Sequence, residues 1–272
     1  MAGRSRKGFA MTALQFPVLH PARGNASASV VFLHGGNVAN WMWQPQVEAF
    51  NDYQVITPDL PGFGARTGER WISLDHAADE VAELIRAKAD GPVHLVGLSL
   101  GGIVALRLLA RHPRLVTSSL VSGVPALGVD GVTGALARVQ LRCWDYKWFW
   151  QLQARAFRLP ADSYGVFVEH GLRMQSANAH RMLGEVFAGG LPPGLVEYRG
   201  RLLALAGGKE PRAICDALKV IARTVPHGVA AVVPGMHHVW NVEDPPLFNE
   251  VVRQWINGSV HAGLNVPDTT AR

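Results

Sequence analysis

Short apolar runs separated by helical patterns are the feature of this sequence that most limits its fold. Four of these runs lie in the first half of the chain, at Ser29–Gly35, Tyr53–Leu60, Pro92–Ser99 and Leu115–Gly123. They are nearly continuous in apolar character, which is typical of strands in a sheet that is covered on both faces. The sequence therefore predicts an α/β fold with a mostly parallel central sheet flanked by helices, which form the crossovers.

Helical patterns fill the spaces between these runs. The helix expected at residues 73–90 begins at Ser73, a candidate N-cap, and ends before Gly91. The same alternation resumes near the C-terminus. Two strands and two helices are expected there, at residues 201–208, 211–223, 228–235 and 245–256.

The segment between the two halves breaks the alternation. It contains helical stretches, an aromatic cluster at Cys143–Trp150 and Gly-Pro punctuation at Gly189–Gly194, over a length too great for one ordinary crossover. We therefore expect an all-helical insertion on the α/β core. The predicted organisation is a core at 12–125 and 199–258, a helical insertion at 126–198, and flexible tails at 1–11 and 259–272.

One serine stands at the junction of a predicted strand and a predicted helix. It is Ser99 in VGLSLGG, with Gly97 two residues before it and Gly101 two residues after it. A strand before and a helix after are the context that the G-x-S-x-G pattern requires. A tight turn there strains the serine backbone, and side chains at the flanking positions would collide. The hydroxyl then projects from the sheet, near the N-terminal amides of the next helix.

This stretch resembles the nucleophile elbow of the α/β-hydrolase superfamily, and the resemblance covers most of the chain. It implies the α/β-hydrolase fold, with the helical insertion as a cap and Ser99 as the nucleophile. A serine hydroxyl needs a base, and the base needs an orienting acid. The superfamily order is Ser, acid, His, so both partners should follow Ser99. For the pentapeptide alone, a turn without chemistry or a phosphate-binding turn is the alternative.

The base is expected in the loop PGMHHVWNVEDPP, just before the last helix. His238, Glu243 and Pro245 match the spacing of the superfamily's late loop, so the resemblance makes His238 the base. The residue before it is His237, where the superfamily usually has glycine. A catalytic role for His237 therefore stays open.

The acid is expected after the strand at 201–208, where GGKEP offers Glu210. The superfamily's version of this loop commonly has aspartate, which is one methylene shorter. Glutamate can still accept the imidazole N–H and stabilise the imidazolium. The alternative is an exposed loop carboxylate at the start of a helix, with Asp216 and Asp130 as weaker substitutes for the acid.

The early loop LHGGNVANWMW resembles the superfamily's HGG loop, whose backbone N–H helps to form an oxyanion hole. By position, the amides of Gly36 and Leu100 are the expected donors. Four other conspicuous residues are expected to hold loops or to pack: His34, Asp59, Trp41 and Trp43.

Composition limits the other function classes. Hydrophobic residues make up 48% of the 272 residues, but no apolar run is long enough to span a bilayer. The net charge of +5 comes from scattered Arg and Lys, which disfavours nucleic-acid binding. The sequence has no metal-ligand spacing, phosphate loop or dinucleotide fingerprint, so no cofactor is expected.

The location expected for the chain is the cytoplasm. Cys143 and Cys215 are far apart and are expected to be buried thiols in a reducing compartment. The N-terminus fits a signal peptide poorly, and translation from Met11 instead of Met1 is an open alternative.

The resemblance implies a serine hydrolase, most of all a carboxylesterase, that cleaves an ester of a small apolar substrate through an acyl-enzyme. The aromatic residues of the insertion are expected to line the substrate pocket or to hold the cap on the core. A C–C bond hydrolase, a lactonase, a thioesterase and a cofactor-free perhydrolase use the same triad and stay open. From a different class, a ligand receptor with slow turnover is the alternative. The sequence indicates no macromolecular partner and no oligomeric state.

Overall fold

A single seven-stranded sheet forms the centre of the protein. The computed structural model describes residues 16–128, 139, 141–157, 159 and 161–266. The strands are β1 (Leu19–His20), β2 (Ser29–Leu33), β3 (Gln54–Ile56), β4 (Val93–Leu98), β5 (Ser118–Ser122), β6 (Arg201–Gly207) and β7 (Gly228–Val233). Their order is β1-β3-β2-β4-β5-β6-β7, and only the pairing of β1 with β3 is antiparallel. The predicted mostly parallel sheet is confirmed.

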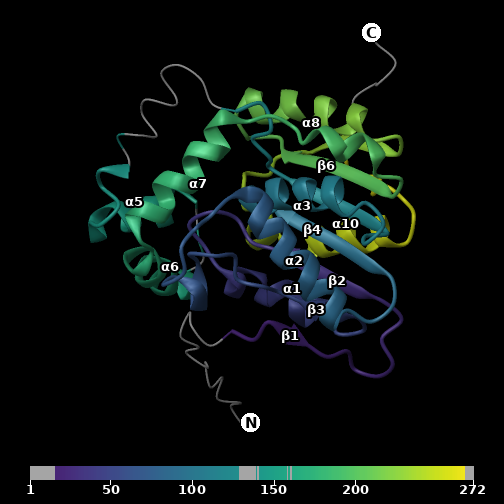
Figure 1. Cartoon of the computed structure of the whole chain (residues 1–272), viewed down its shortest axis with the longest axis horizontal. Coiled ribbons are helices and arrows are strands. Elements are labelled where there is room, and N and C mark those ends of the chain that lie inside the picture. The colour runs from purple at the N-terminus through teal and green to yellow at the C-terminus, as the bar shows by residue number, and fades with distance from the viewer. Residues whose placement is uncertain (1–15, 129–138, 140, 158, 160, 267–272) are drawn as a thin grey trace, which may run out of the picture.

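Helices cover both faces of this sheet. The α-helices of the described residues are α1 (Gln44–Ala49), α2 (Leu74–Lys88), α3 (Leu100–Arg111), α5 (Lys147–Ala156), α6 (Ala161–Arg173), α7 (Ser176–Ala188), α8 (Arg212–Thr224), α9 (Trp240–Glu243) and α10 (Pro245–Ile256). Short 3-10 helices are η1 (Asn40–Trp43), η2 (Gly64–Arg66) and η3 (Pro193–Glu197). Figure 1 shows α2, α3 and α8 in front of the sheet, with α1 and α10 behind it. Cover on both faces is the reason that the strands are apolar throughout.

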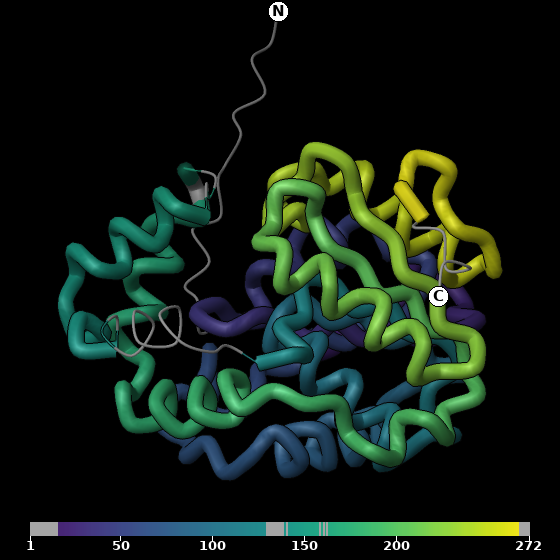
Figure 2. The backbone as a smooth tube through the Cα atoms, turned by 90° about the horizontal axis from the view of Figure 1, so that it is seen from above, coloured from purple at the N-terminus to yellow at the C-terminus, as the bar shows by residue number. Residues whose placement is uncertain are grey.

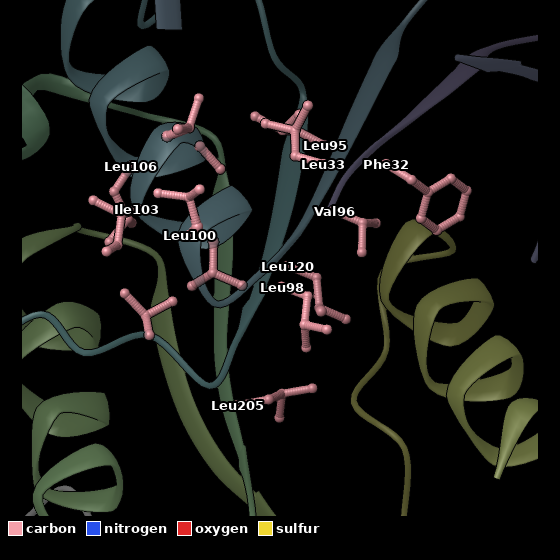
Figure 3. Close-up of a cluster of buried hydrophobic side chains, with 14 of the residues drawn as sticks. Phe32, Leu33, Leu95, Val96, Leu98, Leu100, Ile103, Leu106, Leu120 and Leu205 are labelled. Carbon is pink, nitrogen blue, oxygen red and sulfur yellow. The ribbon is translucent and has the colours of Figure 1, made fainter. Parts of the chain in front are cut away.

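The strand register divides the core into two layers. Phe32 of β2 pairs with Val96 of β4, and both point away from α3, toward the C-terminal helices (Figure 3). The Phe32 ring also packs against Trp43 and Phe50, at centroid distances of 5.0 and 5.5 Å. Trp43 is fully buried there, in agreement with its expected packing role. Leu33 points to the other face of the sheet.

The local signals at the helix and strand ends agree with the structure in most places. Ser73 caps α2 by accepting the backbone N–H of His76 at 3.0 Å, as predicted. The second predicted strand is shorter than expected, because the chain leaves the sheet after Ile56 and enters a loop. Strand β1 and helix α1 were not predicted, since neither is long enough to show a clear period.

Two expectations about the rest of the chain are wrong. The described part of the tail that starts at residue 259 is docked on the core. There Leu264 is buried, and the backbone of Asn265 exchanges two hydrogen bonds with Val232, of 2.8 and 2.9 Å. Cys143 and Cys215 are both free but half-buried, whereas buried thiols were expected. Both side chains pack against the hydrophobic core without being enclosed by it.

Helices α5, α6 and α7 come between β5 and β6 and gather to one side of the sheet (Figures 1 and 2). Helix α7 is held by two polar side chains. Asn178 accepts the Trp71 N–H at 2.9 Å and donates to Glu69 O at 2.7 Å. Glu185 accepts from Trp71 Nε1 at 2.8 Å and from the Leu74 N–H at 3.0 Å. Within the described residues, no helix combines the length and apolar character that crossing a membrane requires.

Candidate active site

Ser99 occupies a tight turn between β4 and α3. Its backbone has φ 54° and ψ −115°, in a region that L side chains rarely adopt. A Cβ at Gly97 would lie 2.5 Å from Gly101 O, and a Cβ at Gly101 would collide with Leu33 O. Both flanking positions therefore need glycine, and the strain predicted at the serine is present.

His238 and Glu210 form a close pair in the loops that follow β7 and β6. Nδ1 of His238 lies 2.6 Å from Oε2 of Glu210. The Glu210 side chain is 1% exposed, and its other oxygen, Oε1, accepts the Gly207 N–H at 2.9 Å. A buried carboxylate bound at both oxygens can hold the imidazole in one orientation, with the ring proton on Nδ1. Nε2 is then left as a proton acceptor.

Gly123, directly after β5, brings this pair beside the serine. The Ser99 N–H donates to Ser122 O at 2.8 Å, so the turn at Gly123 lies next to the elbow. A Cβ at Gly123 would lie 2.7 Å from His238 Nδ1 and 3.2 Å from Glu210 Oε2. The described residues include no hydrogen bond between the Ser99 hydroxyl and His238. Such contacts often tighten only when substrate binds.

His237 faces a different carboxylate. Its Nδ1 lies 2.7 Å from Glu243 Oε1, and its backbone N–H donates to Glu243 Oε2 at 2.8 Å. Partial burial acts to raise the pKa of Glu243, but the hydrogen bonds from His237 outweigh it and lower that pKa. The two adjacent histidines are therefore paired separately, and only His238 contacts Glu210.

The weaker candidates for the acid lie elsewhere. Asp216 is on α8, with its side chain 63% exposed and 3.9 Å from Arg212. Asp130 lies outside the described residues. Of the three carboxylates considered from the sequence, Glu210 is the one that meets an imidazole in the part of the chain that the structure describes.

The backbone amides of Gly36 and Leu100 lie beside the elbow. Leu100 is the first residue of α3, so its N–H has no partner within the helix. A Cβ at Gly35 would lie 3.6 Å from Ser99 Cβ, which places the loop after β2 against the serine. Neither amide donates to another backbone group among the described residues. Both are free to donate to an oxygen that develops negative charge near Ser99.

His34 and Asp59 hold the loops around these amides. His34 is fully buried; its Nδ1 binds Gly35 O at 2.8 Å, and its Nε2 accepts the Leu60 N–H at 3.0 Å. Burial lowers the pKa of His34, although the Asp59 charge opposes this, so the imidazole is neutral. Asp59 accepts two backbone N–H groups, at 2.9 and 2.8 Å. Both residues have the structural role expected of them.

Helix α6 lies against the same loops through a buried histidine. His170 is 1% exposed, with its ring centroid 6.4 Å from those of both Trp41 and Phe63. Burial lowers the pKa of His170 to about 3. Its Nε2 and the Nε1 of Trp41 are buried without a hydrogen-bond partner among the described residues. Trp41 packs against the helical segment, as its expected role requires.

A mainly apolar pocket lies between α3 and the end of α7. Its lining includes Ile103 and Arg107 of α3, Val124, Glu185 and Val186 of α7, and residues 189–192. Ser99, His238 and Glu210 do not line it. In the described part of the chain, no group of three His, Cys, Asp or Glu side chains is arranged to hold a metal ion.

Comparison with known proteins assigns the family. A model of the alpha/beta hydrolase family matches residues 30–251, which is most of the chain. The chain belongs to the alpha/beta hydrolase family. This alpha/beta hydrolase is 25% identical over 257 residues to an "AB hydrolase superfamily protein" of Gibberella zeae, covering 88% of this chain and 83% of the relative. It is 27% identical over 254 residues to the "Putative carbamate hydrolase RutD" of Pantoea ananatis, covering 85% and 90%.

A solved structure agrees on the fold. MenH from S. aureus superposes on this alpha/beta hydrolase with a TM-score of 0.68 at 22% identity, over 88% of this chain and 97% of that one. Structural similarity at 22% identity supports a shared fold and nothing beyond it. Together, the family and the named relatives make the protein a hydrolase.

Three features of this alpha/beta hydrolase were not singled out from its sequence. Gly123 is in contact with the His238–Glu210 pair, but a glycine at the end of a strand looks like an ordinary stop signal. Asn178 and Glu185 bind the loop before α2. Their spacing of seven residues places them on one helix face, a signal that could have marked that face as an anchor.

Proposed function

We propose that this alpha/beta hydrolase is a serine hydrolase that cleaves a carboxylic ester through an acyl-enzyme. Ser99 is the nucleophile, His238 the general base and Glu210 the acid that orients the base. The observation that carries the proposal is the 2.6 Å contact between His238 Nδ1 and a buried Glu210, with Gly123 bridging from this pair to the turn at Ser99.

In the first half of the reaction, His238 Nε2 takes the Ser99 hydroxyl proton as Oγ attacks the ester carbonyl. Glu210 holds the ring by its Nδ1 proton and stabilises the imidazolium that forms. The amides of Gly36 and Leu100 donate to the oxygen of the tetrahedral intermediate. His238 then protonates the leaving alcohol, which leaves the acyl group on Ser99.

In the second half, water enters and His238 takes its proton. The resulting attack on the acyl-enzyme passes through a second tetrahedral intermediate at the same two amides. As this intermediate collapses, His238 returns the proton to Ser99 Oγ and the acid is released. Apart from substrate and water, every group in the proposed cycle belongs to this chain.

The substrate class that we propose is a small, largely apolar ester. A mainly apolar pocket between α3 and the end of α7, lined in part by Ile103, Val124 and Val186, supports this class. Helices α5 to α7 act in this proposal as a cap over the elbow. The contacts of α6 and α7 with the loops after β2 and β3 support that position, through His170 and Asn178.

Two measurements test the proposal. A fluorophosphonate probe should label the purified protein at Ser99, and p-nitrophenyl esters of two to eight carbons should be turned over. Ser99→Ala should lose both labelling and turnover while its thermal unfolding curve stays in place. Turnover that persists in Ser99→Ala, or a wild-type protein that no fluorophosphonate labels, would refute the assignment of the nucleophile.

A carbamate is the second candidate substrate class, because a relative aligned over 85% of the chain is named for that activity. The same three residues can attack the carbonyl of a carbamate ester. The alcohol then leaves to give a carbamoyl-enzyme, water releases carbamic acid, and this acid loses CO₂ to leave ammonia or an amine. A panel of esters, lactones, thioesters, carbamates and β-diketones, read as kcat/KM, decides between the classes. Labelling without turnover of any substrate, together with a ligand-dependent change in partner binding, would favour a receptor.

A further inference from the structure

The outward face of α5 is apolar. The inner face of this helix is already buried through Phe149, Trp150 and Ala154. On the outer side, Trp148 and Leu152 are 54% and 57% exposed. They are four residues apart and therefore lie on one face of the helix. A helix that is apolar on both sides is normally covered on both sides, and the described residues leave the outer side of α5 open.

Tyr146 extends this apolar face. It is 57% exposed, and its ring stacks on Trp148 with a centroid distance of 6.3 Å and an interplanar angle of 28°. We refer to Tyr146, Trp148 and Leu152 as the α5 outer face. Large hydrophobic side chains such as Ile72 and Val196 are also exposed outside α5, but single exposed side chains of this kind are ordinary on a protein surface.

Basic residues outnumber acidic ones in the stretch of chain that carries the α5 outer face. The stretch from 141 to 157 carries three basic side chains and one acidic one. All four are exposed: Arg142, Asp145, Lys147 and Arg155. Arg155 is seven residues after Trp148, so it lies on the same side of the helix. The face therefore combines two large amphipathic rings, an aliphatic side chain and a net positive rim.

We propose that the α5 outer face docks on the surface of an anionic phospholipid bilayer. Tyr and Trp rings favour the level of the headgroups, where their apolar bodies are buried and their polar tips stay hydrated. Lys and Arg at the rim are attracted to anionic headgroups at the same time. The surface complements such a bilayer in both apolar character and charge.

A second copy of the chain fits this face less well. A two-fold interface would pack the face against itself and bring Lys147 and Arg155 near the same residues of the other copy. Like charges across an interface oppose association, whereas a sheet of anionic headgroups attracts them. Docking would present the helices beside the active site to a source of apolar esters, but docking itself does not depend on the chemistry of Ser99.

Sedimentation of the full-length protein with sucrose-loaded vesicles tests this inference. The vesicles contain phosphatidylcholine alone, or phosphatidylcholine with 30 mol% phosphatidylglycerol as probe, at roughly physiological ionic strength. The protein should sediment with the anionic vesicles and remain in solution with the neutral ones. Trp148→Ser with Leu152→Ser should weaken that partitioning about tenfold or more, since two large apolar side chains are removed.

Charge reversal and matched control variants distinguish binding through the α5 outer face from nonspecific adsorption to the vesicles. Lys147→Glu with Arg155→Glu should also abolish sedimentation with anionic vesicles, and neither change removes a buried group. Val196→Ser with Val220→Ser removes two exposed apolar side chains outside α5 and should leave partitioning unchanged. Arg212→Glu with Lys219→Glu reverses two exposed charges on α8, which lies away from α5 in Figure 1. This variant should also leave partitioning unchanged.

Each possible result of these vesicle experiments either supports or overturns the inference. Equal sedimentation with neutral and anionic vesicles, or patch variants that bind as the wild type does, would overturn the inference. Concentration-dependent dimers that dissociate in the Trp148 and Leu152 variant would assign the face to a second copy instead. Ser99→Ala should bind vesicles like the wild type, so failure of the proposed catalysis and failure of docking are seen in separate measurements.

Discussion

Replacing Glu210 by Gln tests the proposed acid with the least change of shape. In the native site, Glu210 Oε1 accepts the Gly207 N–H at 2.9 Å while Oε2 meets His238 Nδ1 at 2.6 Å. A glutamine has one acceptor oxygen and one NH₂ group. If its oxygen keeps the Gly207 bond, its NH₂ faces Nδ1 and requires that nitrogen to accept. The ring proton then moves to Nε2, which is the atom that has to take the proton from Ser99.

The expected loss is large because the tautomer is wrong while the fold is retained. An acid-to-amide change of this kind lowers kcat by about 10⁴-fold in a comparable triad. That factor corresponds to about 5.5 kcal/mol of transition-state stabilisation. The Glu210 side chain is 1% exposed, so water cannot replace the lost acceptor from bulk solvent. KM should change little, since Glu210 lies behind the imidazole and away from the substrate.

Two readouts and one matched control make the result decisive. The readouts are kcat and KM on a p-nitrophenyl ester, and the rate of fluorophosphonate labelling, which does not require the natural substrate. The control is Glu243→Gln, which changes the carboxylate that meets His237 instead. It should leave kcat unchanged if His238 is the base. A Glu210→Gln enzyme within tenfold of wild type, or a Glu243→Gln enzyme that loses as much activity, would refute the assignment of acid and base.

Three further outcomes are expected. Gly123→Ala should lower kcat about 100-fold, because the new Cβ would lie 2.7 Å from the His238 ring; a kcat near wild type in steady-state assays would contradict this. If the acyl group reaches the pocket between α3 and the end of α7, Val186→Trp should fill that pocket and shift the preference among p-nitrophenyl esters toward short acyl chains; an unchanged chain-length profile would show that the acyl group lies elsewhere. Burial lowers the pKa of His170 to about 3. Below pH 6.5, this histidine therefore binds a proton in the unfolded chain but not in the folded protein. The free energy of unfolding should then fall as the pH falls, until about pH 3. Between pH 6.5 and 4.5 this group should lower the free energy of unfolding in urea by about 2 kcal/mol, and a pH dependence in His170→Phe equal to that of the wild type would contradict that assignment.

The sheet could be predicted because its signals are local. Strands β2, β4 and β5 are short apolar runs followed by turns, and each prediction overlaps the observed strand within a few residues. β1 has two residues and acquires its place by pairing with β3, so no pattern within its own sequence marks it. The docking of residues 264–265 on β7 depends in the same way on a partner 33 residues earlier.

The site was predictable wherever a motif and an element boundary coincide. Ser99 lies between a strand and a helix, and its neighbours must be glycine because their Cβ atoms would collide with backbone. The spacing shared with the superfamily indicates His238 as the base, but the sequence leaves a role for His237 open. The two histidines are adjacent, and the choice depends on the turn that directs one ring to Glu210 and the other to Glu243.

The use of glutamate in place of the usual aspartate has a local physical reason. Glu210 lies three residues after Gly207, and its side chain returns to accept the Gly207 N–H at the end of β6. The same carboxylate also contacts His238 in the loop after β7. One of its oxygens therefore binds the end of β6, and the other binds the loop after β7. Aspartate is one methylene shorter, so from an unchanged backbone we expect it to keep only one of these two contacts. Glu210→Asp should therefore keep a carboxylate near His238 but lose one of the two contacts. Its activity should fall between those of wild type and Glu210→Gln, and activity equal to wild type would show that the extra methylene has no role in placing the acid.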